Sequence, residues 1–89
     1  MNSLAISARL REIAAYLVLE GDRFRARAYE KAARSLEGVQ DLERLITERR
    51  LTELPRIGPS LAGAIEELSR SGTIDLLDRL REKWPKLVL

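Results

Sequence analysis

Four basic side chains recur at helical spacing in one segment of the chain. They are separated by four, four and three positions, which places them on one face of a helix: Arg23, Arg27, Lys31 and Arg34. Residues 23–34 hold five basic side chains and one acidic side chain, so this segment carries +4, whereas the whole chain carries +2. The stripe has two interpretations, a solvated surface or a track for phosphates. Its single sign favours the phosphate track, because solvated faces usually mix charges.

A second feature with phosphate-binding chemistry lies between residues 51 and 68. A short helical turn with Leu51 and Leu54 is followed by Pro55-Arg56-Ile57-Gly58-Pro59 and then by a new helix. The first backbone amides of a helix have no acceptor inside it and lie at the positive end of the helix dipole. A tight turn into a helix can therefore bind an anion. The alternative is an ordinary corner between two helices, since proline and glycine occur in many such corners.

Three residues of this turn supply the expected donors. They are the amides of Arg56, Gly58 and Ser60, with the Ser60 hydroxyl as a fourth group. Gly58 is expected to let the backbone bend and to let a phosphate approach without meeting a Cβ. Ile57 is expected to point inward and anchor the hairpin. Contacts of this kind position a protein on DNA but read no bases.

The composition narrows the chemistry further. The chain has no cysteine and no histidine, which removes disulfides, thiol catalysis, the usual general base and the usual metal ligand. The carboxylates are scattered singly or paired as neighbours on a helix surface, such as Glu66 and Glu67, and they predict no two-metal site. No signal-peptide pattern or membrane-length apolar run occurs, so we expect a cytoplasmic protein.

Helical periodicity dominates the elements that must position these groups. The first helix is expected to begin at Asn2 or Ser3 and stop at Gly21, and the second to run from Asp22 to Leu36 and end at Gly38. Asp41 is expected to cap a short third helix. Pro59 opens a helix that Gly72 closes, and Thr73 is expected to cap a last one that Pro85 breaks. The prediction is an all-α bundle of four main helices plus a short helical turn, forming one domain over residues 1–89.

Apolar spacing also predicts which side of each helix is buried. In the first helix Glu12 falls away from the apolar stripe. The second helix is expected to bury these side chains: Phe24, Ala28, Tyr29, Ala32, Ala33 and Leu36. In the last helix Ile74, Leu77, Leu80 and Trp84 form the expected seam.

Two motifs together resemble a known family. The hairpin spacing resembles the helix-hairpin-helix motif at Leu51, Leu54, Ile57, Gly58, Ala62, Ile65 and Leu68. The run Phe24-Arg25-Ala26-Arg27-Ala28-Tyr29-Glu30-Lys31-Ala32-Ala33 resembles the second helix of the amino-terminal domain of X-family DNA polymerases, the DNA polymerase beta family. Both motifs occur in that family's order and separation, and the bacterial members are the most similar. The resemblance implies binding at the 5′-phosphate side of a gap in duplex DNA, by a free-standing module or by the first piece of a longer polymerase.

The resemblance also assigns roles to single residues. Tyr29 and Lys31 match family positions near the 5′-phosphate pocket, and Arg25 matches another basic position. The carbonyls of Thr52, Leu54 and Ile57 match those that hold a monovalent cation, K⁺ or Na⁺, in such hairpins. With the stripe and the turn, the expected DNA-binding set is Arg23, Arg25, Arg27, Tyr29, Lys31, Arg34, Arg56, Gly58 and Ser60.

Some members of the family also remove 5′-deoxyribose phosphate through a lysine that forms a Schiff base. This chain differs from them at that lysine and at two neighbouring positions. That lysine position is Ala64, a nearby basic position is Ser60, and the first glycine of the hairpin is Arg56. Alanine cannot form an imine. Lys31, between two arginines, is the remaining candidate for a weak lyase, because cationic neighbours favour a neutral amine, although solvent screening opposes this.

Two classes of function follow from these observations. The first is a non-sequence-specific DNA-backbone module for gapped, nicked or 5′-phosphorylated DNA in repair. The second is a protein-interaction module that keeps the fold without DNA contact, with an apolar patch at Trp84, Leu87, Val88 and Leu89 as its surface. A core position for Trp84 with a frayed tail is the alternative interpretation of that patch.

Overall fold

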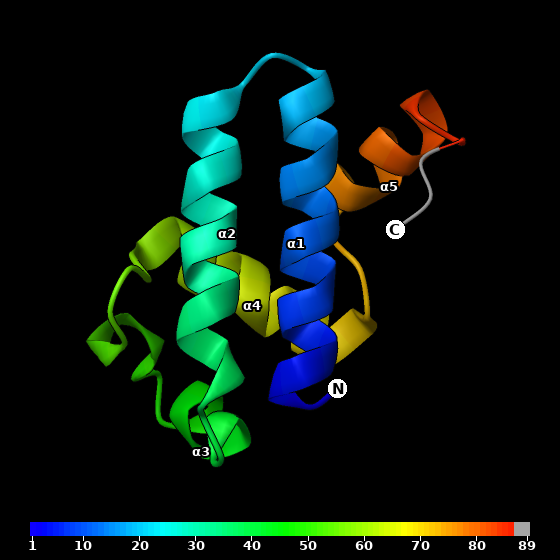
Figure 1. Ribbon diagram of the computed structural model, residues 1–89. Helices are drawn as coiled ribbons and strands as arrows, with labels where there is room; N and C mark the ends of the chain where they lie inside the picture. The colour runs from blue at the N-terminus through cyan, green and yellow to red at the C-terminus, as the bar shows by residue number, and fades with distance from the viewer. Residues whose placement is uncertain (87–89) are drawn as a thin grey trace.

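The order of elements follows the capping residues and breakers of the sequence. The computed structural model describes residues 1–86, and within that range all regular structure is helical. The elements are α1 (Ser3–Leu19), α2 (Arg23–Glu37), α3 (Leu42–Thr47), the 3₁₀ turn η1 (Leu51–Glu53), α4 (Pro59–Ser71) and α5 (Asp75–Lys83) (Figure 1). The predicted all-α bundle is confirmed: α1, α2, α4 and α5 are the main helices, and η1 is the short turn.

Side-chain caps and left-handed glycines set the helix ends. The Asn2 side chain accepts the Ala5 amide at 2.8 Å, and Asp22 Oδ1 accepts the Arg25 amide at 3.1 Å. Gly21 and Gly72 have φ of +81° and +80°, values that glycine adopts without strain, and they end α1 and α4. These boundaries agree with the sequence prediction.

The start of α5 differs from the prediction. Its N-cap residue is Ile74 rather than Thr73. The Thr73 hydroxyl instead donates to the Asp78 carboxylate in the first turn of α5 at 2.6 Å. It therefore caps no backbone amide. Asp41 does stand at the N-cap position of α3, although its side chain makes no capping hydrogen bond there.

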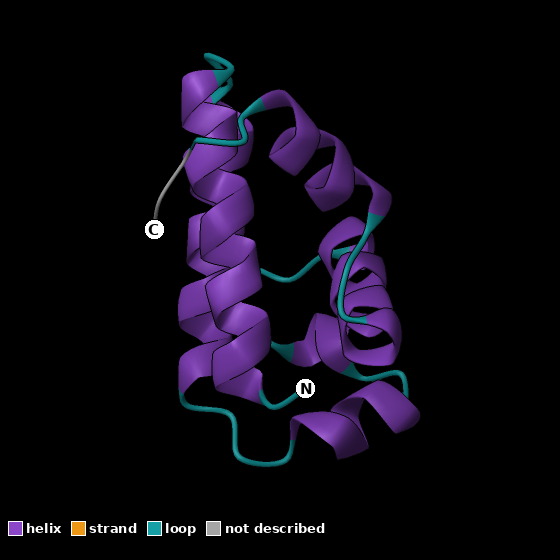
Figure 2. Cartoon of the chain, turned by 90° about the vertical axis from the view of Figure 1, so that its right-hand side faces the viewer, coloured by secondary structure: helices purple, strands orange, loops and turns teal. Residues whose placement is uncertain are grey.

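The helices form two layers around one core. Helices α1 and α2 run antiparallel side by side, and α3, α4 and α5 lie behind them (Figures 1 and 2). Small residues let α1 and α2 approach closely: Ala32 and Ala33 are fully buried, and the Ser7 hydroxyl donates to the Ala33 carbonyl at 3.0 Å. The largest buried side chains come from both layers: Ile6, Leu10, Ile13, Leu36, Ile65, Leu68 and Leu77.

Glu12 is buried, contrary to the prediction that it lies away from the apolar stripe. Its residue is 9% exposed, and its carboxylate accepts two hydrogen bonds from Arg81, Nε to Oε2 at 2.6 Å and Nη2 to Oε1 at 2.8 Å. The Tyr16 hydroxyl donates to the same carboxylate at 3.2 Å. The packing of α5 against this side of α1 supplies the partner that makes burial of the charge tolerable.

Phe24 is exposed, which corrects a second burial prediction. The side chain is 88% exposed, and Ala28 and Tyr29 are only partly buried. Helix α1 packs against the side of α2 that carries Ala26 and Ala33, and Phe24 lies on a different side of α2. The apolar residues of α2 extend over about half of its circumference, from Phe24 round to Ala33, and periodicity alone could not tell which part of that surface would meet α1.

No helix among residues 1–86 has the length and apolar character needed to cross a membrane.

Candidate nucleic-acid interface

The hairpin is held in place by apolar anchors. Ile57 is 4% exposed and Leu51 is 2% exposed, so both ends of the turn are fixed in the core. The Leu54 amide donates to the Leu51 carbonyl at 3.0 Å, and the Ile57 amide donates to the Leu54 carbonyl at 3.3 Å. The predicted role of Ile57 as an inward anchor is confirmed. The rest of the turn, from Pro55 to Gly58 apart from Ile57, faces solvent.

The turn presents backbone amides that have no partner in the described part of the chain. The first internal bond of α4 runs from the Ala62 amide to the Gly58 carbonyl at 2.9 Å. Pro59 has no N–H, and no acceptor within residues 1–86 meets the amides of Arg56, Gly58, Ser60 and Leu61. Three of these donors were predicted. Leu61 was missed, although the third residue of any helix also lacks an internal acceptor.

The bend of the backbone occurs at Arg56 rather than at Gly58. Arg56 has φ of +67°, in the left-handed region, whereas Gly58 has an ordinary φ of −89°. The prediction that Gly58 supplies the bend is therefore wrong. A Cβ added at Gly58 would meet nothing within 4 Å, so the protein leaves the space beside this Cα open.

A hydrogen bond fastens the hairpin to α2. The Ser35 hydroxyl donates to the Pro55 carbonyl at 2.6 Å. Two hollows lie along this junction, of about 260 Å³ and 200 Å³, and both are lined by Lys31 and Arg56. The larger also contains Phe24, Arg27 and Ala28, and the smaller contains Arg34 and Ser35. Residues far apart in the sequence thus form one continuous basic surface.

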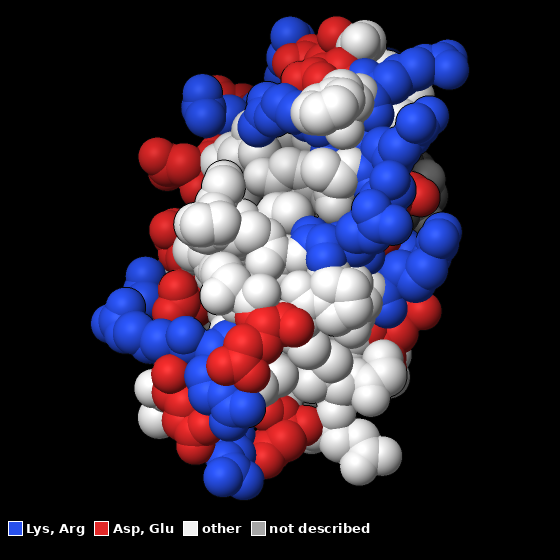
Figure 3. Space-filling view, turned by 90° about the vertical axis from the view of Figure 1, so that its left-hand side faces the viewer, with Lys and Arg blue, Asp and Glu red and all other residues white. Residues whose placement is uncertain are grey.

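No acid neutralises the cations of this surface within the described residues, which is also true of Arg9, Arg49, Arg70 and Arg79. The surface is distinguished by several such cations lying together. Among residues 1–86, Arg23, Arg27, Lys31, Arg34 and Arg56 make no ion pair. Six other basic residues are paired with carboxylates: Arg11, Arg25, Arg44, Arg50, Arg81 and Lys83. Figure 3 shows Lys and Arg along the right-hand side of the face formed by α2, α3 and the hairpin, next to an uncharged centre, whereas charges of both signs mix in the lower part.

Two residues that the resemblance implied are not on this surface. Arg25 lies on another side of α2 and pairs with Asp22 at 3.6 Å. Tyr29 is half-buried and packs against the core. Both positions follow from the helical repeat, since neither shares the spacing of the stripe. Ala64, at the family's lysine position, is also half-buried against the core.

The carbonyls expected to hold a monovalent cation lie in the same turn. The Leu54 carbonyl accepts the Ile57 amide, while the carbonyls of Thr52 and Ile57 accept no hydrogen bond within the described residues. Two of the three carbonyl oxygens are therefore free to accept a cation such as K⁺ or Na⁺, and the site itself stays a prediction.

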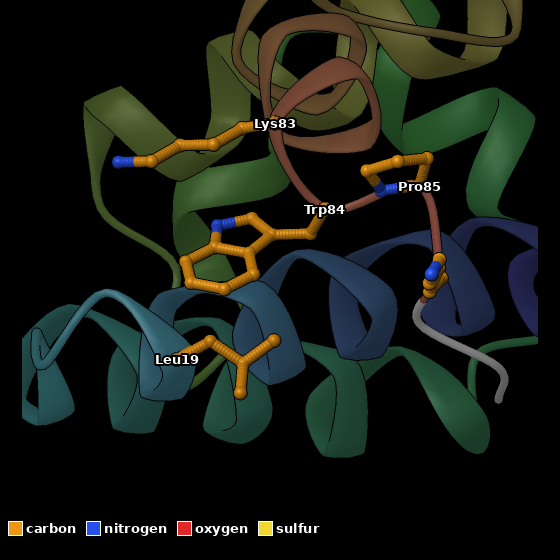
Figure 4. A pocket seen from close by; sticks show the side chains of 5 residues that line it. Leu19, Lys83, Trp84 and Pro85 are labelled. Atoms are coloured by element: carbon orange, nitrogen blue, oxygen red, sulfur yellow. The ribbon is translucent and has the colours of Figure 1, made fainter.

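A separate hollow lies on the side of the molecule away from the hairpin, where α5 ends beside the last turn of α1 (Figures 1 and 4). Its volume is about 480 Å³, and it is lined by Leu19, Lys83, Trp84, Pro85 and Lys86. Trp84 is half-buried, packs on the core and donates its indole N–H to Glu20 at 3.2 Å. The remaining members of the predicted apolar patch, Leu87, Val88 and Leu89, lie outside the described residues.

The site thus consists of two helical segments joined by a tight turn that presents backbone amides, beside a basic face of α2 that no carboxylate neutralises within the described residues. The sequence profile of the helix-hairpin-helix domain family matches residues 1–74. The chain belongs to this family, whose domains generally bind DNA without sequence specificity. A search of curated proteins found no match.

Proposed function

We propose that this chain binds the sugar-phosphate backbone of DNA through the hairpin and the stripe of α2. The observation that carries the proposal is their adjacency: unpartnered amides and unneutralised cations meet at Arg56 and Lys31, and no acid lines either hollow there. Phosphate oxygens would complete both sets of donors. A DNA strand carries phosphates at regular intervals, and a row of cations along a helix can contact several of them.

The two parts of the surface have different tasks in this proposal. The amides of Gly58, Ser60 and Leu61 and the positive end of α4 hold one phosphate in a fixed direction. The α2 stripe neutralises phosphates farther along the strand and steers the encounter. Neither part reads base edges, so the binding is non-specific in sequence and strongly dependent on salt.

A finer proposal concerns the kind of DNA. The resemblance to the amino-terminal domain of X-family DNA polymerases points to gapped, nicked or 5′-phosphorylated duplexes in repair. Phe24 supports this choice, because an aromatic ring that is 88% exposed beside Arg27 and Lys31 can stack on an unpaired base. An intact duplex offers no unpaired base to such a ring.

A titration of the ¹⁵N-labelled protein with a gapped, 5′-phosphorylated duplex tests the proposed function. We expect the amide signals of residues 56–58, Ser60 and Leu61 and of Arg27 to Arg34 to shift together as DNA is added, because these groups meet the phosphates. The signals of α5 serve as the internal reference. Unchanged signals of residues 56–58, Ser60 and Leu61 at saturating DNA would contradict backbone binding by the hairpin.

Replacing Phe24 with alanine is expected to weaken binding to gapped DNA by about tenfold, since stacking on one base contributes about 1–3 kcal/mol. Binding to an intact duplex of the same length should change little. Fluorescence anisotropy with both DNAs measures this difference. Leu4→Ala removes another exposed side chain, 65% exposed on α1, and is the matched control. An equal loss on both DNAs would show that Phe24 does not recognise unpaired bases.

A further inference from the structure

Arg56 adopts a backbone conformation that arginine rarely adopts. Its φ of +67° lies in the left-handed region, where a Cβ is disfavoured and glycine is not. Within residues 1–86 its side chain makes no hydrogen bond or ion pair, so the fold itself does not use the guanidinium. No side-chain contact within the described residues explains this conformation, and Arg49 shares it with φ of +55°. What distinguishes Arg56 is its position beside Lys31.

The surroundings of Arg56 show what its side chain could bind. Lys31 lines the same two hollows, and Arg34 and Ser35 complete the smaller one. The bond from the Ser35 hydroxyl to the Pro55 carbonyl, at 2.6 Å, fixes the peptide just before Arg56 and so aims the tip of the hairpin at α2. Cations held together in this way repel each other until an anion lies between them.

We propose that Arg56 and Lys31 form a two-cation clamp for one internal phosphodiester of the DNA strand, separate from the phosphate held by the α4 amides. This inference rests on the proposed function and deepens it. A guanidinium offers two parallel donors to phosphate oxygens, and an ammonium adds a point charge from the other side. The hairpin thus gains a side-chain contact that a glycine at this position could not make.

The test compares Arg56→Gly with Arg49→Gly. Arg49 is also an arginine in the left-handed region, with φ of +55°, and it makes no ion pair within residues 1–86. It lines a different hollow, with Leu51, Thr52, Ala62 and Glu66. Both variants remove one charge and one strained backbone position, so neither should lose thermal stability. Only Arg56→Gly removes a member of the clamp.

We expect Arg56→Gly to raise the Kd for gapped duplex by about tenfold relative to Arg49→Gly, the loss typical of a charged hydrogen bond. The slope of log Kd against log salt concentration should also fall by about one, which marks the loss of one phosphate contact. Equal losses with 5′-phosphorylated and 5′-hydroxyl DNA are expected for an internal phosphodiester. A loss confined to the 5′-phosphorylated DNA would overturn that assignment in favour of a terminal phosphate.

Binding of inorganic phosphate, measured alone and against DNA, distinguishes whether the ligand of the clamp is DNA or a free anion. If phosphate at low millimolar concentration binds wild type and not Arg56→Gly, yet leaves the Kd of wild type for DNA unchanged, the clamp binds free phosphate and the assignment to DNA is overturned. Equal Kd values for Arg56→Gly and Arg49→Gly would refute the clamp alone. Failure of the wild-type protein to bind any DNA would refute the proposed function itself, so the two failures are distinguishable.

Discussion

Replacing both Arg27 and Lys31 with glutamate is expected to weaken binding to gapped duplex DNA by about 100-fold or more near 0.1 M salt. Each substitution removes a cation that contacts a phosphate and adds a charge that repels it. Both positions line the hollow between α2 and the hairpin, whose charged side chains are Arg27, Lys31 and Arg56, so the two glutamates would leave Arg56 as its only cation. Fluorescence anisotropy over a range of salt concentrations measures both the Kd and its salt dependence.

The matched control is the double substitution Arg70→Glu with Arg79→Glu. These two arginines are exposed and unpaired within the described residues, and they lie on α4 and α5 rather than on the stripe. The control has the same net charge as the test variant. Arg11 would be a poorer control, because it pairs with Glu37. Equal weakening in both double variants would mean that net charge, and not the stripe, governs binding.

The second large effect concerns the fold. We expect Glu12→Ala to lower the free energy of unfolding by about 2–3 kcal/mol, because the Arg81 guanidinium and the Tyr16 hydroxyl lose their shared acceptor. Arg81 retains partial access to water, which keeps the cost below that of a fully buried pair. For a domain of this size the melting temperature should fall by about 10 °C or more. Urea denaturation followed by circular dichroism gives the free energy.

Glu37→Ala provides the comparison for this stability prediction. Glu37 also pairs with an arginine from another helix, Arg11, but both side chains are more than a third exposed. Exposed ion pairs contribute between zero and about 1 kcal/mol, so this variant should unfold at nearly the wild-type urea concentration. Similar losses in the two variants would mean that the Glu12 network has no special importance for the fold.

The same network makes stability depend on pH. Hydrogen bonds from Arg81 hold the pKa of Glu12 below its ordinary value of 4.5, and burial acts in the opposite direction. Because the folded pKa is lowered, the carboxylate stabilises the fold fully above the unfolded pKa, and this contribution is lost as pH falls through the folded pKa. Unfolding measured between pH 7 and pH 3 should therefore show a smaller decline for Glu12→Gln than for wild type.

Local sequence signals predicted much of the fold and part of the interface. Capping residues such as Asn2 and Asp22 and the glycines that end helices act over a few residues, so they can be interpreted without knowing the rest of the molecule. The hairpin was predicted for the same reason, since its donors follow from the start of a helix. The clustering of Arg23, Arg27, Lys31 and Arg34 on one face needed only the helical repeat.

Only the tertiary structure decided which faces meet. The burial of Glu12 depends on Arg81, which lies 69 positions later, and the exposure of Phe24 depends on where α1 packs against α2. The proximity of Arg56 to Lys31 depends on the bond between Ser35 and the Pro55 carbonyl. Periodicity shows which residues of a single helix share a side. Which other helix packs against that side depends on the packing of the whole core. The sequence therefore determined the helices and their charged faces, and long-range packing determined which of those faces became one surface.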